Sequence, residues 1–202
     1  RLEVLRHVAV ARLDGASLRE ATLAGARLDG ASFAYADLSD ARLPRARGAG
    51  VQLRFARLSG ADLTEASLPG AKLRDANLSR ARARGAVLTE AELRSVDLTG
   101  ADLGGADLAA ASMPFARCYE ARLAGARLPE ADLTGADLTK VDLSGADLEA
   151  ATLTRAPFEA TDLSGARLDR AFLHGAGLAS ARLAKARFFR ASMIGADLAG
   201  QD

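Results

Sequence analysis

Alanine recurs at every fifth position from Ala11 to Ala196 without any change of register. This span contains 38 such positions, and 34 of them hold alanine. The position two residues later holds leucine in 30 of the 38 units, and 16 of the 19 glycines stand two residues after that leucine position. Units such as ADLTG, ADLSG and ASLPG therefore repeat an Ala–polar–Leu–x–Gly pattern. A fixed period of this kind indicates a solenoid, in which each repeat buries its apolar side chains by stacking on its neighbours.

The five-residue period does not fit an α-helix. Residue propensity alone would favour a helix, because Ala, Leu, Arg and Glu are good helix formers. On a helix, however, positions five apart are rotated by about 140° per repeat, so leucine would face every side. In an extended segment, alanine and leucine two residues apart point the same way, and the residue between them points outward. A turn must follow, where glycine removes the steric cost of a positive φ.

This repeat resembles the A(D/N)LXX consensus of the pentapeptide-repeat family over roughly residues 11–200. The resemblance implies an all-β fold, a right-handed quadrilateral parallel β-helix with four repeats per coil. On that geometry the 38 repeats make about 9.5 coils, which stack about 4.8 Å apart into a rod roughly 45 Å long. Residues 20 apart would then be neighbours. One such series alternates in charge: Arg42, Asp62, Arg82, Asp102, Arg122, Asp142. Because opposite charges stabilise neighbouring strands, this alternation supports the 20-residue coil independently.

Composition predicts one elongated domain, a β-helix over residues 11–202. Residues 1–10 (RLEVLRHVAV) are interpreted as a cap or the stub of a preceding segment. Because the last repeat is incomplete and has no polar cap, we expect either an excised domain or a rod capped by its own dimer partner. No apolar run is long enough to span a membrane and no signal peptide is visible, which predicts a cytoplasmic protein without a membrane partner.

No residue pattern indicates an enzyme, a cofactor site or a metal site. His7 lies outside the repeats, and His174 occupies an outward turn position about eight coils away. Cys118 replaces a leucine and is expected to be a small buried hydrophobe. The aspartates are spread one per repeat, the glycines follow the five-residue frame, and there is no tryptophan. Direct nucleic-acid binding is therefore not expected.

Two features depart from the repeat. Aromatic residues at one corner, together with apolar residues near the C-terminus, are either scattered surface side chains or a patch for a partner or a second copy. This candidate interaction patch comprises Tyr35, Phe55, Phe115, Phe172, Phe189 and Ile194. The second feature is the loss of the central leucine at Gly48 and Ala83, which thins the core beside arginine-rich stretches. Those units are either degenerate repeats or a local bend or anion-contacting spot.

Two functions remain open. The first is a non-enzymatic rod that presents flat faces to a protein partner, with self-association through the C-terminal coils as one form of it. The second follows from the resemblance, because some family members mimic DNA, bind DNA gyrase and protect it from inhibitors. The net charge of +1 and the interspersed arginines do not imitate DNA. Only one acidic region could play that part: Glu130, Asp132, Asp137, Asp142, Asp147 and Glu149.

Overall fold

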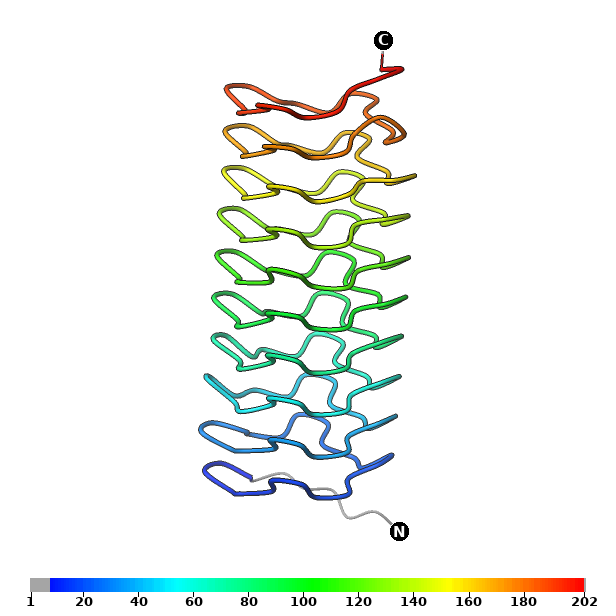
Figure 1. The fold of residues 1–202 in the computed structure, drawn as a ribbon. Helices are drawn as coiled ribbons and strands as arrows, with labels where there is room; N and C mark the ends of the chain where they lie inside the picture. The colour runs from blue at the N-terminus through cyan, green and yellow to red at the C-terminus, as the bar shows by residue number, and fades with distance from the viewer. Residues whose placement is uncertain (1–7, 202) are drawn as a thin grey trace.

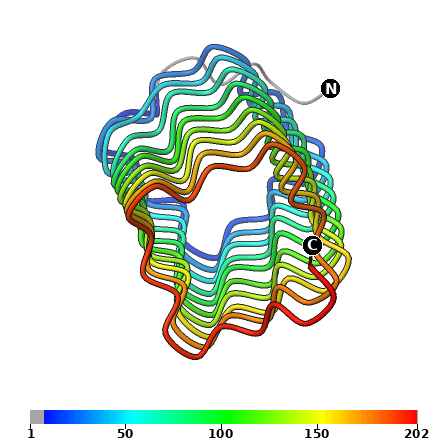
Figure 2. The same ribbon diagram turned by 90° about the horizontal axis from the view of Figure 1, so that it is seen from above.

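The chain forms a straight, four-sided rod of stacked coils (Figures 1 and 2). The structure is a computed structural model and describes residues 8–201. This range excludes His7, Asp202 and most of residues 1–10, the segment interpreted as a cap or the stub of a preceding segment. Within it there is no helix, and the extended pieces meet through isolated parallel bridges, each centred on the outward residue of a repeat. No helix among these residues could therefore cross a membrane.

Every bridge joins residues that are 20 apart, which confirms the register predicted from the charge alternation. The series Arg42↔Asp62, Asp62↔Arg82 and Arg82↔Asp102 is one example. Three backbone hydrogen bonds per repeat connect successive coils. At Leu103, its amide donates to the carbonyl of Arg122 at 2.7 Å, and the Arg122 amide donates to the carbonyl of Ala101 at 2.9 Å. The third runs from the Gly105 amide to the carbonyl of Ala124 at 3.0 Å. Each coil is thus held by the backbone of the coils on both sides.

The turns have one conformation whether or not they contain glycine. The residue two after leucine has a φ between 53° and 78° throughout the described chain, with Ser180 as the exception. The amide of the following residue then closes the turn onto the leucine carbonyl, as between Ala106 and Leu103 at 3.0 Å. Sixteen of these positive-φ residues are glycine, which adopts this conformation without steric cost. The other 22 include Tyr35 and Phe55, held there at a cost of roughly 1–2 kcal/mol each.

The interior is built from the alanine and leucine positions, as predicted. Leu103 and Ala101 are fully buried, and Leu63 is 4% exposed. Phe33 and Phe158 replace leucine and are also buried. Thr161 replaces alanine, and its hydroxyl donates to the Leu138 carbonyl at 2.6 Å. Among residues 8–201, no buried side-chain nitrogen or oxygen lacks a hydrogen-bond partner.

The leucine positions of the repeat are less buried in the terminal coils. Leu13, Leu183 and Met193 are only partly buried, and Leu198 is 40% exposed. At the other end, Val8 already occupies a buried core position, and its amide bonds the Arg27 carbonyl at 3.1 Å. Repeat geometry therefore begins before Ala11, within the segment interpreted from sequence as a cap or the stub of a preceding segment.

Candidate interaction surface

The aspartates at the outward position stabilise the turns that follow them. In each case Oδ1 accepts the backbone amide of the residue two further on, as from Thr134 to Asp132 and from Thr139 to Asp137, both at 3.0 Å. All described aspartates and asparagines at this position make this bond. The bond fixes the start of the turn, which is the usual use of such side chains. The recurrence of Asp and Asn in the repeat therefore follows from turn chemistry.

Between stacked outward positions, the second carboxylate oxygen pairs in one direction along the rod. Arg82 contacts Asp62 Oδ2 at 3.0 Å, and Arg127 contacts Asp107 Oδ2 at 2.8 Å. The same geometry occurs at Arg117–Asp97, Arg167–Asp147, Arg182–Asp162 and Arg57–Asp37. In all of these the arginine lies in the coil after the aspartate. Among the described residues, no arginine at the outward position of the preceding coil makes such a pair, so charge alternation yields fewer ion pairs than its pattern suggests. The arginines of the preceding coil that do contact Oδ2 occupy turns: Arg84 with Asp102 at 3.1 Å and Arg19 with Asp37 at 3.8 Å.

The six residues of the predicted acidic region do not gather on one face. Asp132, Asp137, Asp142 and Asp147 follow one another at five-residue intervals, so each stands on a different side of the rod. Glu130 and Glu149 occupy turns. The Glu149 carboxylate also forms ion pairs with two arginines, Arg167 at 2.5 Å and Arg170 at 3.5 Å. The acidic residues thus form a band around the rod.

One carboxylate lies in a dense ionic cluster beside this band. Asp169 is buried, and its Oδ2 is 3.2 Å from Arg167 Nε and 3.0 Å from Arg187 Nη2. Its Oδ1 accepts the backbone amide of Phe189 at 3.0 Å. Burial opposes ionisation, but this amide and the two guanidinium groups outweigh it and lower the pKa of Asp169. Sequence reasoning missed this cluster, because Asp169 occupies a turn position that carries no conserved role in the repeat.

The aromatic residues at one corner are exposed and ordered against one another. The rings of Tyr35 and Phe55 stack with centroids 4.9 Å apart and an interplanar angle of 4°. Phe115 lies on the same corner three coils beyond Phe55, and the guanidinium of Arg94 lies 5.0 Å from its centroid. The three aromatic side chains are between 45% and 65% exposed.

The other three predicted patch residues lie nearer the C-terminus. Phe172 stands on the face that precedes the aromatic corner, and its ring meets His174 edge-on at 6.2 Å. Phe189 occupies the corner before that face, and Ile194 lies on the aromatic corner, four coils beyond Phe115. All three are exposed, at 46%, 61% and 74%. The six predicted residues therefore divide into a corner set (Tyr35, Phe55, Phe115) and a C-terminal set (Phe172, Phe189, Ile194).

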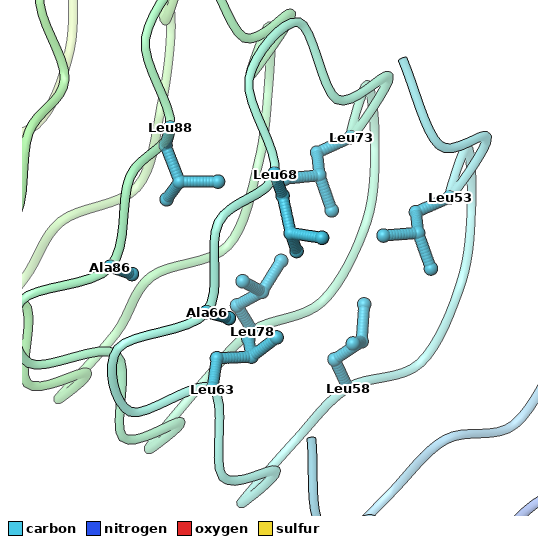
Figure 3. A pocket seen from close by; sticks show the side chains of 9 residues that line it. All are labelled: Leu53, Leu58, Leu63, Ala66, Leu68, Leu73, Leu78, Ala86 and Leu88. Atoms are coloured by element: carbon cyan, nitrogen blue, oxygen red, sulfur yellow. The ribbon is translucent and has the colours of Figure 1, made fainter. Parts of the chain in front are cut away.

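The core contains a small cavity in the two coils over residues 51–90. It has a volume of about 10 Å³ and is lined only by leucine and alanine side chains between Leu53 and Leu88, and neither Gly48 nor Ala83 is part of the lining (Figure 3). Such a lining offers a water molecule no hydrogen-bond partner. On the outside, a hollow nearby is lined by Arg27, Arg45 and Arg47 together with Gly25 and Asp29. Two of these arginines contact carboxylates, Arg45 with Glu65 at 2.7 Å and Arg27 with Asp29 at 3.8 Å.

The remaining reactive side chains do not come together. Cys118 is buried as predicted, and desolvation, aided by Asp137 and Asp97, raises the pKa of its thiol to about 12. His174 Nε2 lies 2.6 Å from the hydroxyl oxygen of Ser192 on the next coil. Along the described chain, no group of three His, Cys, Asp or Glu side chains is arranged to hold a metal ion.

Comparison with known proteins agrees with this geometry. The family model for pentapeptide repeats matches eight copies, at residues 11–47, 49–82, 71–109, 116–155 and 156–193. HetL, a pentapeptide repeat protein involved in heterocyst differentiation regulation in Nostoc sp. strain PCC 7120, is 34% identical; the alignment covers 97% of this chain and 88% of HetL, with a TM-score of 0.49. A trypsin-treated form of QnrB1, a plasmid-mediated fluoroquinolone resistance protein, is 19% identical over 92% of both chains, with a TM-score of 0.51. No curated protein matches the chain.

Proposed function

We propose that this chain, which belongs to the pentapeptide-repeat family, is a non-enzymatic rod that binds a protein partner through its outward side chains. The family fold is a right-handed quadrilateral β-helix, and about 9.5 coils would give flat faces roughly 45 Å long. The observation that carries the proposal is the ordered, exposed aromatic corner. Tyr35 and Phe55 are stacked on each other while 65% and 45% exposed, above a core whose polar groups are satisfied.

Aromatic side chains of this kind stabilise protein interfaces when a partner covers them. They bring a large apolar area at a low cost in conformational entropy, and they are enriched among the residues that dominate binding energy. Here the stack fixes the rings before a partner arrives, which reduces the ordering cost further. The regular spacing of the outward positions then fixes where the charged side chains around the aromatic corner contact that partner. A cytoplasmic location stays a prediction.

The alternative, a DNA mimic that binds DNA gyrase, has weaker support. A mimic needs a continuous negative stripe, since duplex DNA carries one charge per about 1.7 Å of its axis. Here the aspartate columns are interrupted by arginines, which occupy Oδ2 at Asp62, Asp107 and Asp147. The likeness to QnrB1, at 19% identity, concerns the fold alone.

Capture from a lysate of the organism that encodes the chain tests the proposal, followed by a Kd measurement with each purified partner. We expect a saturable protein partner whose affinity falls when Tyr35, Phe55 and Phe115 are all replaced by serine. The matched control replaces Ser67, Thr99 and Ser144, half-buried surface residues on other sides of the rod, by alanine. Failure to find any saturable partner would contradict the proposal. Purified gyrase is assayed in parallel, and protection of its supercoiling activity from a fluoroquinolone would favour the alternative.

A further inference from the structure

We propose that an arginine column on the aromatic corner is the docking ridge for an acidic helical segment of a protein partner. The ridge comprises Arg54, Arg74 and Arg94, with Tyr35 and Phe55 at one end and Phe115 at the other. The inference rests on the proposed function, because it assumes that the rod binds a protein. It adds which part of the rod is used and the chemistry of the segment that is bound.

The three arginines form a column because they are 20 residues apart. Each stands immediately after a central leucine, at the first turn position of the same corner in three successive coils. The aromatic residues occupy the second turn position of that corner: Tyr35 in the coil before the column, Phe55 in its first coil and Phe115 in the coil after it. All three arginines are exposed. Because the residues come from repeats far apart in the sequence, only the stacking of the coils brings them together.

The ridge carries more positive than negative charge within hydrogen-bonding reach. Glu92 is shared by two cations, with Lys72 Nζ at 2.5 Å and Arg54 Nη2 at 3.4 Å. Arg74 pairs with the adjacent Asp75 at 3.1 Å. Arg94 forms no ion pair within residues 8–201 and contacts the face of the Phe115 ring instead. Four cations thus face two carboxylates, which leaves a surplus that an acidic partner would neutralise.

The aromatic ends of the ridge are held in place before binding. The Tyr35 and Phe55 rings are parallel, with centroids 4.9 Å apart. The Phe115 ring lies against Gly135 of the next coil, where a Cβ atom would come within 3.0 Å of two ring carbons. Arginine and aromatic residues that are already ordered are typical of the positions that dominate binding energy. The ridge therefore offers apolar contacts at both ends and positive charge between them.

The spacing of the arginines matches a helix better than a strand. Stacked coils lie about 4.8 Å apart, so the column spans about 9.6 Å from Arg54 to Arg94. Two turns of a helix rise about 10.8 Å, and carboxylates at positions i, i+4 and i+7 lie on one face. Three side chains on one face of a strand span about 13.4 Å. An acidic helix lying along the corner would therefore bring one carboxylate to each arginine.

Two synthetic peptides of identical composition test this assignment. In the first, three glutamates follow the i, i+4, i+7 spacing in an alanine-rich helix with leucine near each end. In the second, the same residues place glutamate at every second position. Binding to the intact chain is measured by calorimetry at two salt concentrations. We expect the helical-period peptide to bind more tightly, and its affinity to fall as salt rises.

Variants that remove arginine charges test whether the peptide binds at the ridge. Replacing Arg54, Arg74 and Arg94 with alanine should weaken binding of the helical-period peptide by about tenfold or more. The matched control replaces Arg42, Arg80 and Arg122, exposed arginines away from the ridge that form no ion pairs among the described residues, and should change the affinity by less than about twofold. Thermal unfolding of both variants checks that the rod is intact.

Three results would overturn the ridge: no binding of either peptide, equal binding of both, or equal weakening by the control variant. A partner from the capture experiment separates this failure from failure of the proposed function. If that partner binds the Arg54, Arg74 and Arg94 variant as tightly as the unmodified chain, the ridge is wrong and the interaction rod stands. If no saturable partner exists, the proposed function itself is wrong.

Discussion

Single residues in this chain are sorted by the five-residue frame into two chemical environments. Leu103 is fully buried among apolar side chains, whereas the adjacent Asp102 lies on the surface. Asp102 accepts the amide of Gly104 at 3.1 Å and contacts Arg84 at 3.1 Å. Neighbouring positions therefore tolerate very different substitutions, although they are covalently adjacent.

We expect Leu103→Asp to destabilise the rod by about 3–5 kcal/mol, because a carboxylate buried without a partner must lose its hydration or take up a proton. Asp102→Ala should cost less than about 1 kcal/mol, since its contacts are near the surface. Thermal unfolding of the two variants compares them directly. Equal losses of melting temperature would refute the inward and outward assignments.

Acid should destabilise the folded rod through its carboxylates. The pKa of Asp169 is lower in the folded chain than the ordinary value of 3.8. A group with a depressed folded pKa contributes stability above its unfolded pKa and loses it as the pH falls through the folded value. The contribution of Asp169 is thus complete near neutral pH and is lost progressively as the pH falls from about 3.8 through the lower pKa of the folded state.

The variant Asp169→Asn should lower the melting temperature at pH 7 and narrow the difference between pH 7 and pH 3. Asp29→Asn is the control, because Asp29 is half-exposed and its carboxylate lies as far as 3.8 Å from the guanidinium group of Arg27. A melting-temperature difference between the two pH values that is unchanged in Asp169→Asn would show that the buried cluster does not contribute.

At the scale of one coil, the two missing leucines are not equivalent. A Cβ atom on Gly48 would lie 2.7 Å from Leu28 Cβ and 2.9 Å from the Leu28 backbone carbon, so this position has no room for a side chain. Ala83 also occupies a central position, in a coil whose Leu73, Leu78 and Leu88 line the apolar cavity. The thin core predicted from sequence is therefore closed at Gly48.

We predict that Ala83→Leu stabilises the rod by about 1 kcal/mol, because it restores the leucine of the repeat between Leu63 and Leu103, which hold the same position in the adjacent coils. Gly48→Ala should destabilise it by about 1–3 kcal/mol, because the Leu28 backbone must move. Denaturant unfolding of the two variants measures both changes. A gain of stability from Gly48→Ala would mean that the coils can separate there, contrary to the packing described above.

Much of this coil architecture was predictable, because the apolar frame repeats without slippage. Cys118 was placed inward by its position alone, and the structure buries it; Phe33 and Phe158, which hold the same position of the repeat, are buried as well. The direction of the ion pairs was not predictable, because it depends on which oxygen of each aspartate bonds its own turn. The arginine column was also missed. Its signal in the sequence is the 20-residue register at the first turn position, which places Arg54, Arg74 and Arg94 in one column.

At the scale of the whole molecule, self-association remains a proposal that rests on the C-terminal set. Replacing Phe189 and Ile194, which are 61% and 74% exposed, with serine should shift a dimer towards monomer in sedimentation. Burial of apolar surface supplies about 25 cal/mol per Å², and a two-fold contact is the commonest arrangement. The control replaces Tyr35 and Phe55. If the unmodified chain is monomeric at high concentration, this proposal is wrong.

The central claim is that residues 20 apart in the sequence are neighbours along a rod whose outward side chains remain accessible. Paired cysteines test it directly. Ser67 and Val87 form a bridge between stacked coils, where a separation of about 4.8 Å is within the range of a disulfide. Cys118 is buried and does not compete. Under mild oxidation, peptide mapping should find the 67–87 disulfide in Ser67→Cys with Val87→Cys. Comparable cross-linking of position 67 to a cysteine at 82 or 92 would contradict the four-repeat coil.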